Sequence, residues 1–160
     1  MIQEITAQDQ ISASADIIRQ AFKTVAEEFN LTPRNAPTHP SFITYDALLN
    51  LSKKGVKFFG MFVGELQIGF VAVEKSDEGL YFIEKLAIIP LFRHKGYGTS
   101  LIGFAIEYIR SNTGKKISIG IINEHAVLKN WYKRLGFEEV SEKKYDHLPF
   151  TVCFMEKNLL

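Results

Sequence analysis

The sequence of 160 residues has almost no cysteine and no long apolar segment. Its single cysteine, Cys153, excludes an internal disulfide and fits a reducing compartment. No run of about 18 apolar residues is present, as a membrane-spanning helix would require. Residues 1–10 also lack the basic and then apolar pattern of a secretory leader. These absences predict a soluble cytoplasmic protein without membrane contact.

An excess of charge of one sign is lacking as well. The 19 basic and 18 acidic residues leave a formal net charge of +1, which gives no basic surface for nucleic acid. The four histidines show no paired spacing with cysteines or carboxylates that is typical of a metal site. The sequence therefore predicts a small partner, no nucleic acid and no metal. These histidines are His39, His94, His125 and His147.

The chain does contain enough apolar residues for one compact domain over residues 1–160. Its hydrophobic content is 46%, and its length suits a single core. Apolar residues recur at helical spacing up to Phe29, and three prolines within residues 31–41 then predict a loop. A second short helix is expected over residues 45–52. Residues 58–63, 67–74 and 80–89 follow as strands joined by tight turns, which predicts an antiparallel meander.

The second half of the chain alternates between helical and strand periodicity. Helices are predicted over residues 99–110 and 124–135, and strands over residues 116–122, 140–144 and 150–156. A meander followed by strand–helix–strand–helix predicts a mixed α/β sheet with helices on both faces. Ligands favour the carboxyl ends of neighbouring strands in such sheets, here the strands that end near Ile89 and Ile122.

The segment Arg93–Gly98 joins an apolar strand to a helix and carries the strongest functional signal. The first turn of a helix has unpaired N–H groups and a partial positive charge, so it attracts anions. Gly96 and Gly98 allow an anion to approach the backbone, and Arg93 and Lys95 add positive charge. The pattern predicts a phosphate-binding loop, with a plain strand-to-helix turn as the alternative explanation.

Two widespread phosphate loops do not fit this segment. The dinucleotide fingerprint requires a third glycine where the chain has Leu101, and the triphosphate loop requires Gly-Lys-Ser/Thr. The segment instead resembles the pyrophosphate loop of the GCN5-related N-acetyltransferase (GNAT) family, Arg/Gln-x-x-Gly-x-Gly/Ala after a strand and a proline, here Pro90. Three further segments resemble the family's third strand, the end of its fourth strand and its Tyr-x-x-x-Gly-Phe signature. They are Ile68–Val71, Leu86–Ile88 and Trp131–Phe137.

The resemblance implies a GNAT-like acyl-CoA N-acyltransferase fold and an enzyme that transfers the acetyl group of acetyl-CoA to a primary amine by direct attack. The amine would belong to a small molecule or a peptide. Alternatives are a non-catalytic acyl-CoA-binding module and an enzyme that uses a different acyl group. Homodimers are common in the family, but no segment of this sequence specifies one. The residues implied for acetyl-CoA binding are Leu86, Ala87, Ile88, Arg93, His94, Lys95, Gly96, Tyr97, Gly98 and Thr99.

Two residues are candidates for catalysis. Tyr132 borders the apolar stripe of its helix, and the resemblance implies that it donates a proton to the departing thiolate; a packed core tyrosine is the alternative. Strand alternation places Glu84 with Phe82 and Leu86 and opposite Lys85, so apolar neighbours would raise the pKa of its carboxyl toward that of a useful base. An ordinary edge carboxylate, with water relaying the proton, is the alternative.

One position departs from the family pattern. His125 stands where family members usually carry an asparagine, and Asn123 lies two residues earlier. Either Asn123 is only a helix cap, or the local geometry differs. The loop Leu31–Phe42 corresponds to the family's variable cover of the acceptor site, so it either sets substrate choice or is an ordinary surface loop. The acceptor itself is not identified by the sequence.

Overall fold

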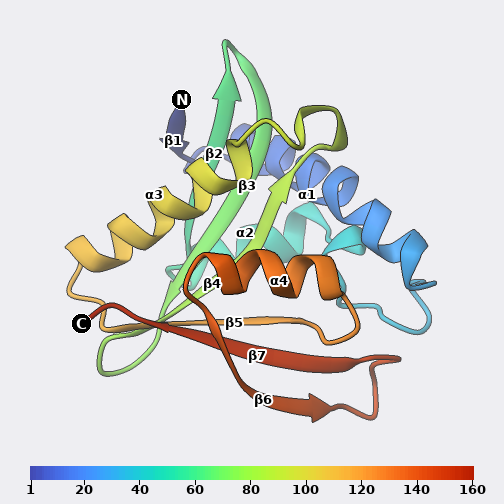
Figure 1. Cartoon of the computed structure of the whole chain (residues 1–160). Helices are drawn as coiled ribbons and strands as arrows, with labels where there is room; N and C mark the ends of the chain where they lie inside the picture. The colour runs from blue at the N-terminus through green and yellow to red at the C-terminus, as the bar shows by residue number, and fades with distance from the viewer.

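A single seven-stranded sheet organises the computed structural model, which describes residues 1–160 (Figure 1). The strands lie in the order β1-β2-β3-β4-β5-β7-β6, and only β4 and β5 run parallel. The predicted meander is therefore β2-β3-β4, and the mixed sheet is confirmed. The bounds are β1 (Ile2–Glu4), β2 (Lys57–Val63), β3 (Leu66–Lys75), β4 (Leu80–Ile88), β5 (Lys116–Ile122), β6 (Glu138–Lys144) and β7 (Thr151–Asn158).

Helices cover both faces of this sheet, as predicted. Phe58 and its neighbour Phe59 point to opposite faces of β2 and belong to different buried clusters. The Phe58 cluster includes residues of α1 and α2, and the Phe59 cluster includes residues of α3 and α4. No helix combines the length and the apolarity that crossing a membrane would need. The helices are α1 (Gln8–Glu28), α2 (Tyr45–Lys53), α3 (Tyr97–Ser111) and α4 (Ala126–Arg134), with short 3-10 turns η1 (Pro40–Phe42) and η2 (Pro90–Phe92).

Two helices begin at different residues from those expected. Helix α3 begins at Tyr97, two residues before the predicted Thr99, because Gly96 turns the chain with a φ of 87°. Helix α4 begins at Ala126 and not at Glu124, because the side chain of His125 accepts a hydrogen bond from the N–H of Leu128 and caps the helix. Both residues responsible come soon after a strand, since Gly96 follows β4 and His125 follows β5.

Strand β4 contains a bulge that changes which side chains share a face. Ala72 pairs with Glu84 and Phe70 pairs with Ala87, so two residues of β4 stand opposite one residue of β3. Lys85, inside the bulge, has a φ of 55°. The prediction that Glu84 and Lys85 point to opposite faces is therefore wrong, because the bulge interrupts strict alternation.

Strands β4 and β5 diverge after a short parallel ladder. Their pairing covers only Leu80–Phe82 against Lys116–Ser118, and Figure 1 shows the two strands separating beyond it. The edge of β4 that faces this gap has no strand partner from Ile83 to Ile88. This gap is the sheet opening predicted near Ile89 and Ile122.

Candidate active site

Two adjoining cavities occupy the gap between β4 and β5. The first, of about 560 Å³, lies beside the 93–99 loop, and we call it the loop cavity. The second, of about 600 Å³, lies between the diverging strands and the 38–40 and 148–150 loops, and we call it the acceptor-side cavity. They have wall residues in common, so one extended ligand can reach from the loop to the sheet opening. The shared residues are Phe22, Val25, Leu86, His125 and Leu128.

The 93–99 loop presents unpaired backbone N–H groups to the loop cavity. The amides of His94, Lys95 and Gly96 make no hydrogen bond within the protein, and the first turn of α3 adds further free N–H groups. Ser100 is the first residue of this helix whose N–H donates a hydrogen bond within the protein, to the carbonyl oxygen of Gly96 at 3.0 Å. A Cβ at Gly96 would have no atom within 4 Å. Open space beside free amides fits a diphosphate group.

Arg93 occupies the loop differently from the prediction. Its guanidinium donates to the carbonyl oxygens of Ala21 at 2.6 Å and Ile88 at 3.1 Å, and to the hydroxyl of Thr24 at 3.0 Å. Burial lowers the pKa of this guanidinium, and its backbone N–H already donates to Pro90. Arg93 therefore connects the loop to α1 and β4, and its backbone amide is not free for an anion. The sequence carries no local signal for these long-range contacts.

The end of β4 leaves part of its main chain open. The N–H of Ile89 donates to the carbonyl oxygen of Ile68 on the β3 side at 2.9 Å. The N–H and C=O groups of successive residues point to alternate edges of a strand, so the main-chain groups of Ala87, two residues earlier, also face β3. The main-chain groups of Leu86 and Ile88 face the gap. The carbonyl of Ile88 accepts from Arg93, which leaves Leu86 and the N–H of Ile88 available. Of the three β4 residues predicted to bind acetyl-CoA, Ala87 is the exception, because its main-chain groups already bond to β3.

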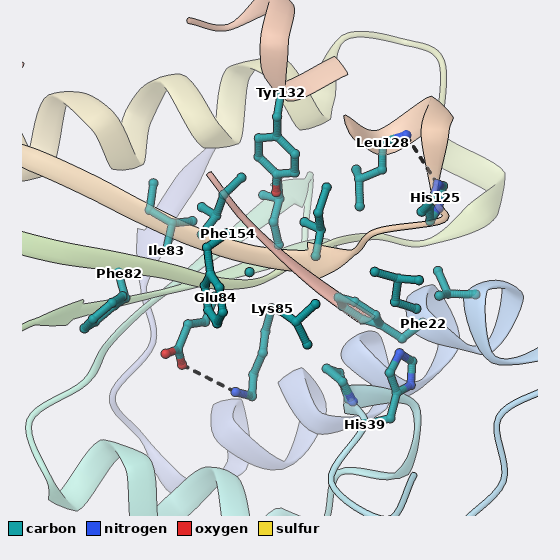
Figure 2. A pocket seen from close by; sticks show the side chains of 18 of the residues that line it. Phe22, His39, Phe82, Ile83, Glu84, Lys85, His125, Leu128, Tyr132 and Phe154 are labelled. Carbon is teal, nitrogen blue, oxygen red and sulfur yellow. Dashed lines mark hydrogen bonds and ion pairs between the residues drawn. The ribbon is translucent and has the colours of Figure 1, made fainter. Parts of the chain in front are cut away.

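Tyr132 combines a packed ring with an open hydroxyl. The residue is 5% exposed, and its ring lies 5.0 Å from that of Trp131 and 5.4 Å from that of Phe137. Its hydroxyl has no hydrogen-bond partner in the protein, and no unpaired side-chain oxygen is fully enclosed, so the hydroxyl reaches the acceptor-side cavity. Figure 2 shows the Tyr132 hydroxyl directed into this cavity. Burial raises the pKa of Tyr132 and keeps the phenol protonated.

Glu84 lines the same cavity beside both apolar and charged neighbours, with Phe82 and Leu86 among the apolar ones. The Lys85 ammonium lies 3.6 Å from its carboxylate, and both side chains reach the cavity from β4 (Figure 2). The carboxyl of Glu74, on β3, also lines this cavity. Burial raises the pKa of Glu74, and hydrogen bonding and repulsion from Glu84 raise it further. The apolar neighbours expected for Glu84 line this cavity, but the bulge adds Lys85, which was expected on the opposite face.

His125 and His39 are two histidines of the site that motif reasoning left without a role. Nδ1 of His125 accepts from the N–H of Leu128 at 3.3 Å, and the ring lines both cavities. Asn123 is not the helix cap, because its side-chain oxygen accepts from Lys129 at 2.6 Å. His39, from the proline-containing loop, also lines the acceptor-side cavity. No three histidine, cysteine or carboxylate side chains gather closely enough to hold a metal ion.

Comparisons with known proteins agree with this geometry. An N-acetyltransferase of Methanocaldococcus jannaschii described as uncharacterized is 38% identical over a match that spans 50% of this chain and 39% of that protein. The chain thus spans well under half of this curated relative.

Solved structures share the fold over nearly the whole chain. The ribosomal-protein-S18-alanine N-acetyltransferase of Escherichia coli matches with a TM-score of 0.78 and 12% identity, covering 99% of this chain and 93% of that one. The PaiA N-acetyltransferase of Thermoplasma acidophilum, solved with coenzyme A, matches with a TM-score of 0.76 and 17% identity over 99% of both chains. The model of the Acetyltransferase (GNAT) family matches residues 20–137. The chain belongs to this family.

Proposed function

We propose that this protein is an N-acetyltransferase that transfers the acetyl group of acetyl-CoA to a primary amine by direct attack. The observation that carries the proposal is the continuous path from the free amides of the 93–99 loop, along the open edge of β4, to the hydroxyl of Tyr132. Family membership and the fold support the same activity.

The residues of this path suit the parts of acetyl-CoA. The N–H groups of His94 to Thr99 would hold the diphosphate, helped by the positive charge of Lys95 and the N-terminus of α3. The open main-chain groups of Leu86 and Ile88 would bond the amide-containing arm as an added strand does. The thioester would then lie where the two cavities meet, near Leu128 and His125.

The acetyl transfer needs a neutral amine and a leaving group that can carry charge. The amine nitrogen forms a bond to the thioester carbonyl carbon, the carbon–sulfur bond breaks, and coenzyme A departs as a thiolate. The proton that the nitrogen loses as it becomes an amide ends, through solvent, on this sulfur. Tyr132 is the donor placed for that sulfur, because its hydroxyl is protonated and has no other partner. Transfer of a proton from a phenol near pKa 10 to a thiolate near 8.5 is uphill by about 2 kcal/mol, and a higher phenol pKa increases this cost. Tyr132 therefore acts chiefly as a hydrogen-bond donor.

The proton of the incoming ammonium must go to a base or to water. Glu84 is the proposed acceptor of this proton, directly or through water, since its carboxylate reaches the acceptor-side cavity. Its carboxylate lies 3.6 Å from the Lys85 ammonium. No protein nucleophile is required, and Cys153 is fully buried away from this path.

Calorimetry with acetyl-CoA tests the proposal on the wild type and on Gly96→Glu. A carboxylate at position 96 would stand among the free amides and repel the diphosphate, so binding should fall at least about 100-fold. Gly55→Glu is the matched control. Gly55 also has a positive φ, 96°, and open space around its Cβ, but it lies between α2 and β2.

Micromolar binding that is lost in Gly96→Glu and kept in Gly55→Glu would establish the loop as the diphosphate site. Absence of binding to the wild type would overturn the proposed activity. Tight binding without release of free coenzyme A in the presence of any amine would favour the acyl-CoA-binding module instead.

A further inference from the structure

The acceptor-side cavity also indicates the class of amine. We infer that the acceptor is a small monoamine with an apolar, ring-sized body that packs against the aromatic wall of the cavity. This inference rests on the proposed acetyl transfer and names its substrate class. It depends on three independent features of the cavity: its wall, its charge and its unpaired polar groups.

The wall of the cavity is predominantly apolar and aromatic. Hydrophobic residues make up 14 of the 23 lining residues, so an extended polar chain would lose hydration here without compensation. Four phenylalanines reach the cavity from α1, β4 and β7 and from the segment before β7. A volume of about 600 Å³ is in the range that encloses a small organic molecule. The four are Phe22, Phe82, Phe150 and Phe154.

Loops from two distant parts of the chain limit the size of the occupant. Thr38, His39 and Pro40 come from the segment between α1 and α2, and Leu148 and Phe150 from the segment between β6 and β7. These side chains line the acceptor-side cavity and not the loop cavity. The 31–42 loop therefore lines the proposed acceptor site, as one of its two predicted roles requires.

The charge of the wall matches a single ammonium group. The ionisable carboxyls that line the cavity are Glu74 and Glu84, and the only lysine is Lys85. Lys85 forms its ion pair with Glu84, whereas Glu74 forms no ion pair with a lysine, although its carboxyl hydrogen-bonds to that of Glu84 and feels the positive charge of Lys85. An ammonium beside the two carboxyls would relieve their repulsion, whereas the further charges of a polyamine would meet the phenylalanines. A carboxylate on the acceptor would face Glu74 and Glu84.

Two buried polar side chains face the cavity without a complete set of partners. Tyr132 is 5% exposed and His39 is 9% exposed. Nδ1 of His39 lies 2.6 Å from the hydroxyl oxygen of Ser41 and 3.3 Å from the Ser41 nitrogen, and burial lowers the pKa of His39 to about 4, so the ring is neutral. Nε2 of His39 has no hydrogen-bond partner in the protein. Since the hydroxyl of Tyr132 is assigned to the leaving sulfur, this ring nitrogen of His39 indicates an acceptor that carries a polar group of its own.

These features make the occupant an amine whose apolar body contacts the phenylalanines and whose polar substituent, such as a ring hydroxyl, reaches His39. Phenethylamine represents the apolar body alone, and tyramine adds the hydroxyl. Spermidine, alanine and a short peptide with an N-terminal alanine represent the competing classes. The test compares their kcat/KM in acetyl-CoA-dependent release of coenzyme A by the wild-type protein.

The result expected is that phenethylamine and tyramine exceed each of the other three amines by at least about 10-fold. Phe154→Ala should lower kcat/KM for phenethylamine about 10- to 100-fold, because it removes a ring from the wall. Phe104→Ala is the matched control, since Phe104 is on α3, is 36% exposed and does not line the cavity. Glu74→Gln should raise the KM for phenethylamine about 10-fold and leave acetyl-CoA affinity unchanged.

Acetyl-CoA calorimetry on the same preparations separates two kinds of failure. If acetyl-CoA binds but spermidine, alanine or the peptide is the best acceptor, this inference is overturned and the proposed function stands. If acetyl-CoA binds and no amine is acetylated, both the transfer activity and the inference fail. Equal losses in Phe154→Ala and Phe104→Ala would also overturn the role of the aromatic wall.

Discussion

At the scale of single residues, Tyr132 shows how one side chain can serve both packing and chemistry. Its ring is held between Trp131 and Phe137, while its hydroxyl has no partner within the protein. Of the two explanations offered by the sequence, the packed core tyrosine describes the ring, and the donor role that we propose would belong to the hydroxyl. The ring fixes where the hydroxyl can act.

Replacement of Tyr132 by phenylalanine should lower kcat about 10²- to 10⁴-fold because the donor to the leaving sulfur is lost. The free energy of unfolding should stay within about 0.5 kcal/mol of the wild type, since the hydroxyl bonds to no protein group. Acetyl-CoA affinity, measured by calorimetry, should also be nearly unchanged. Tyr108→Phe, on α3 and outside both cavities, is the control. An unchanged kcat in Tyr132→Phe would remove the residue from the mechanism.

Arg93 and Glu84 show why sequence reasoning at this scale was incomplete. Both were singled out by type and position, and both line the cavities between β4 and β5. The partners of Arg93 could not be predicted, because Ala21 and Thr24 lie about 70 positions away in the sequence. The partner of Glu84 could not be predicted either, because the bulge that brings Lys85 beside it contains no glycine or proline that would signal it. His39 has no predicted role beyond the absence of metal-site spacing, since burial of its ring depends on tertiary packing.

At the scale of elements, β4 determines the site. Its first part pairs with β5, its bulge redirects Lys85, and its last part exposes main-chain groups to the gap. Periodicity predicted the strand itself well, as it did β2, β3 and β5. It could not predict the bulge or the divergence, since both arise from how β4 meets its neighbours and not from its own residue pattern.

Gly69 on β3 supports the end of β4 by leaving room for it. A Cβ at this position would lie 2.6 Å from Cδ1 of Ile88 and 2.9 Å from the carbonyl oxygen of Ala87. Gly69→Ala should therefore lower the free energy of unfolding by about 1–3 kcal/mol in chemical denaturation. Because Ile88 must move, acetyl-CoA binding should weaken as well.

Gly103→Ala is the control for this substitution. Gly103 lies within α3, where an added Cβ meets no atom within 4 Å, so alanine should stabilise the protein by up to about 1 kcal/mol. An equal free energy of unfolding for the Gly69→Ala variant and the wild type would contradict this prediction and show that β4 can move away from the added Cβ without loss of stability.

At the scale of the whole molecule, the fold brings segments from the early, central and late parts of the chain to one opening. Helix α1 supplies Phe22 and Val25 to the shared wall, the centre of the chain supplies β4 and the 93–99 loop, and β7 supplies Phe154. The order of elements and the mixed sheet could be predicted because each element has its own periodicity. The contribution of Leu148 and Phe150 to the cavity wall could not be predicted, because no local sequence pattern specifies where that segment packs.

The contacts of Arg93 have a consequence for the order in which substrates add. Its guanidinium connects the 93–99 loop to Ala21 and Thr24, which flank Phe22 in the shared wall of the two cavities. A diphosphate that immobilises the loop therefore also immobilises the wall against which the amine must rest. The expected kinetics are compulsory-ordered, with acetyl-CoA first. Coenzyme A should inhibit competitively against acetyl-CoA and non-competitively against the amine, whereas competitive inhibition against both would mean that the loop and the wall are independent.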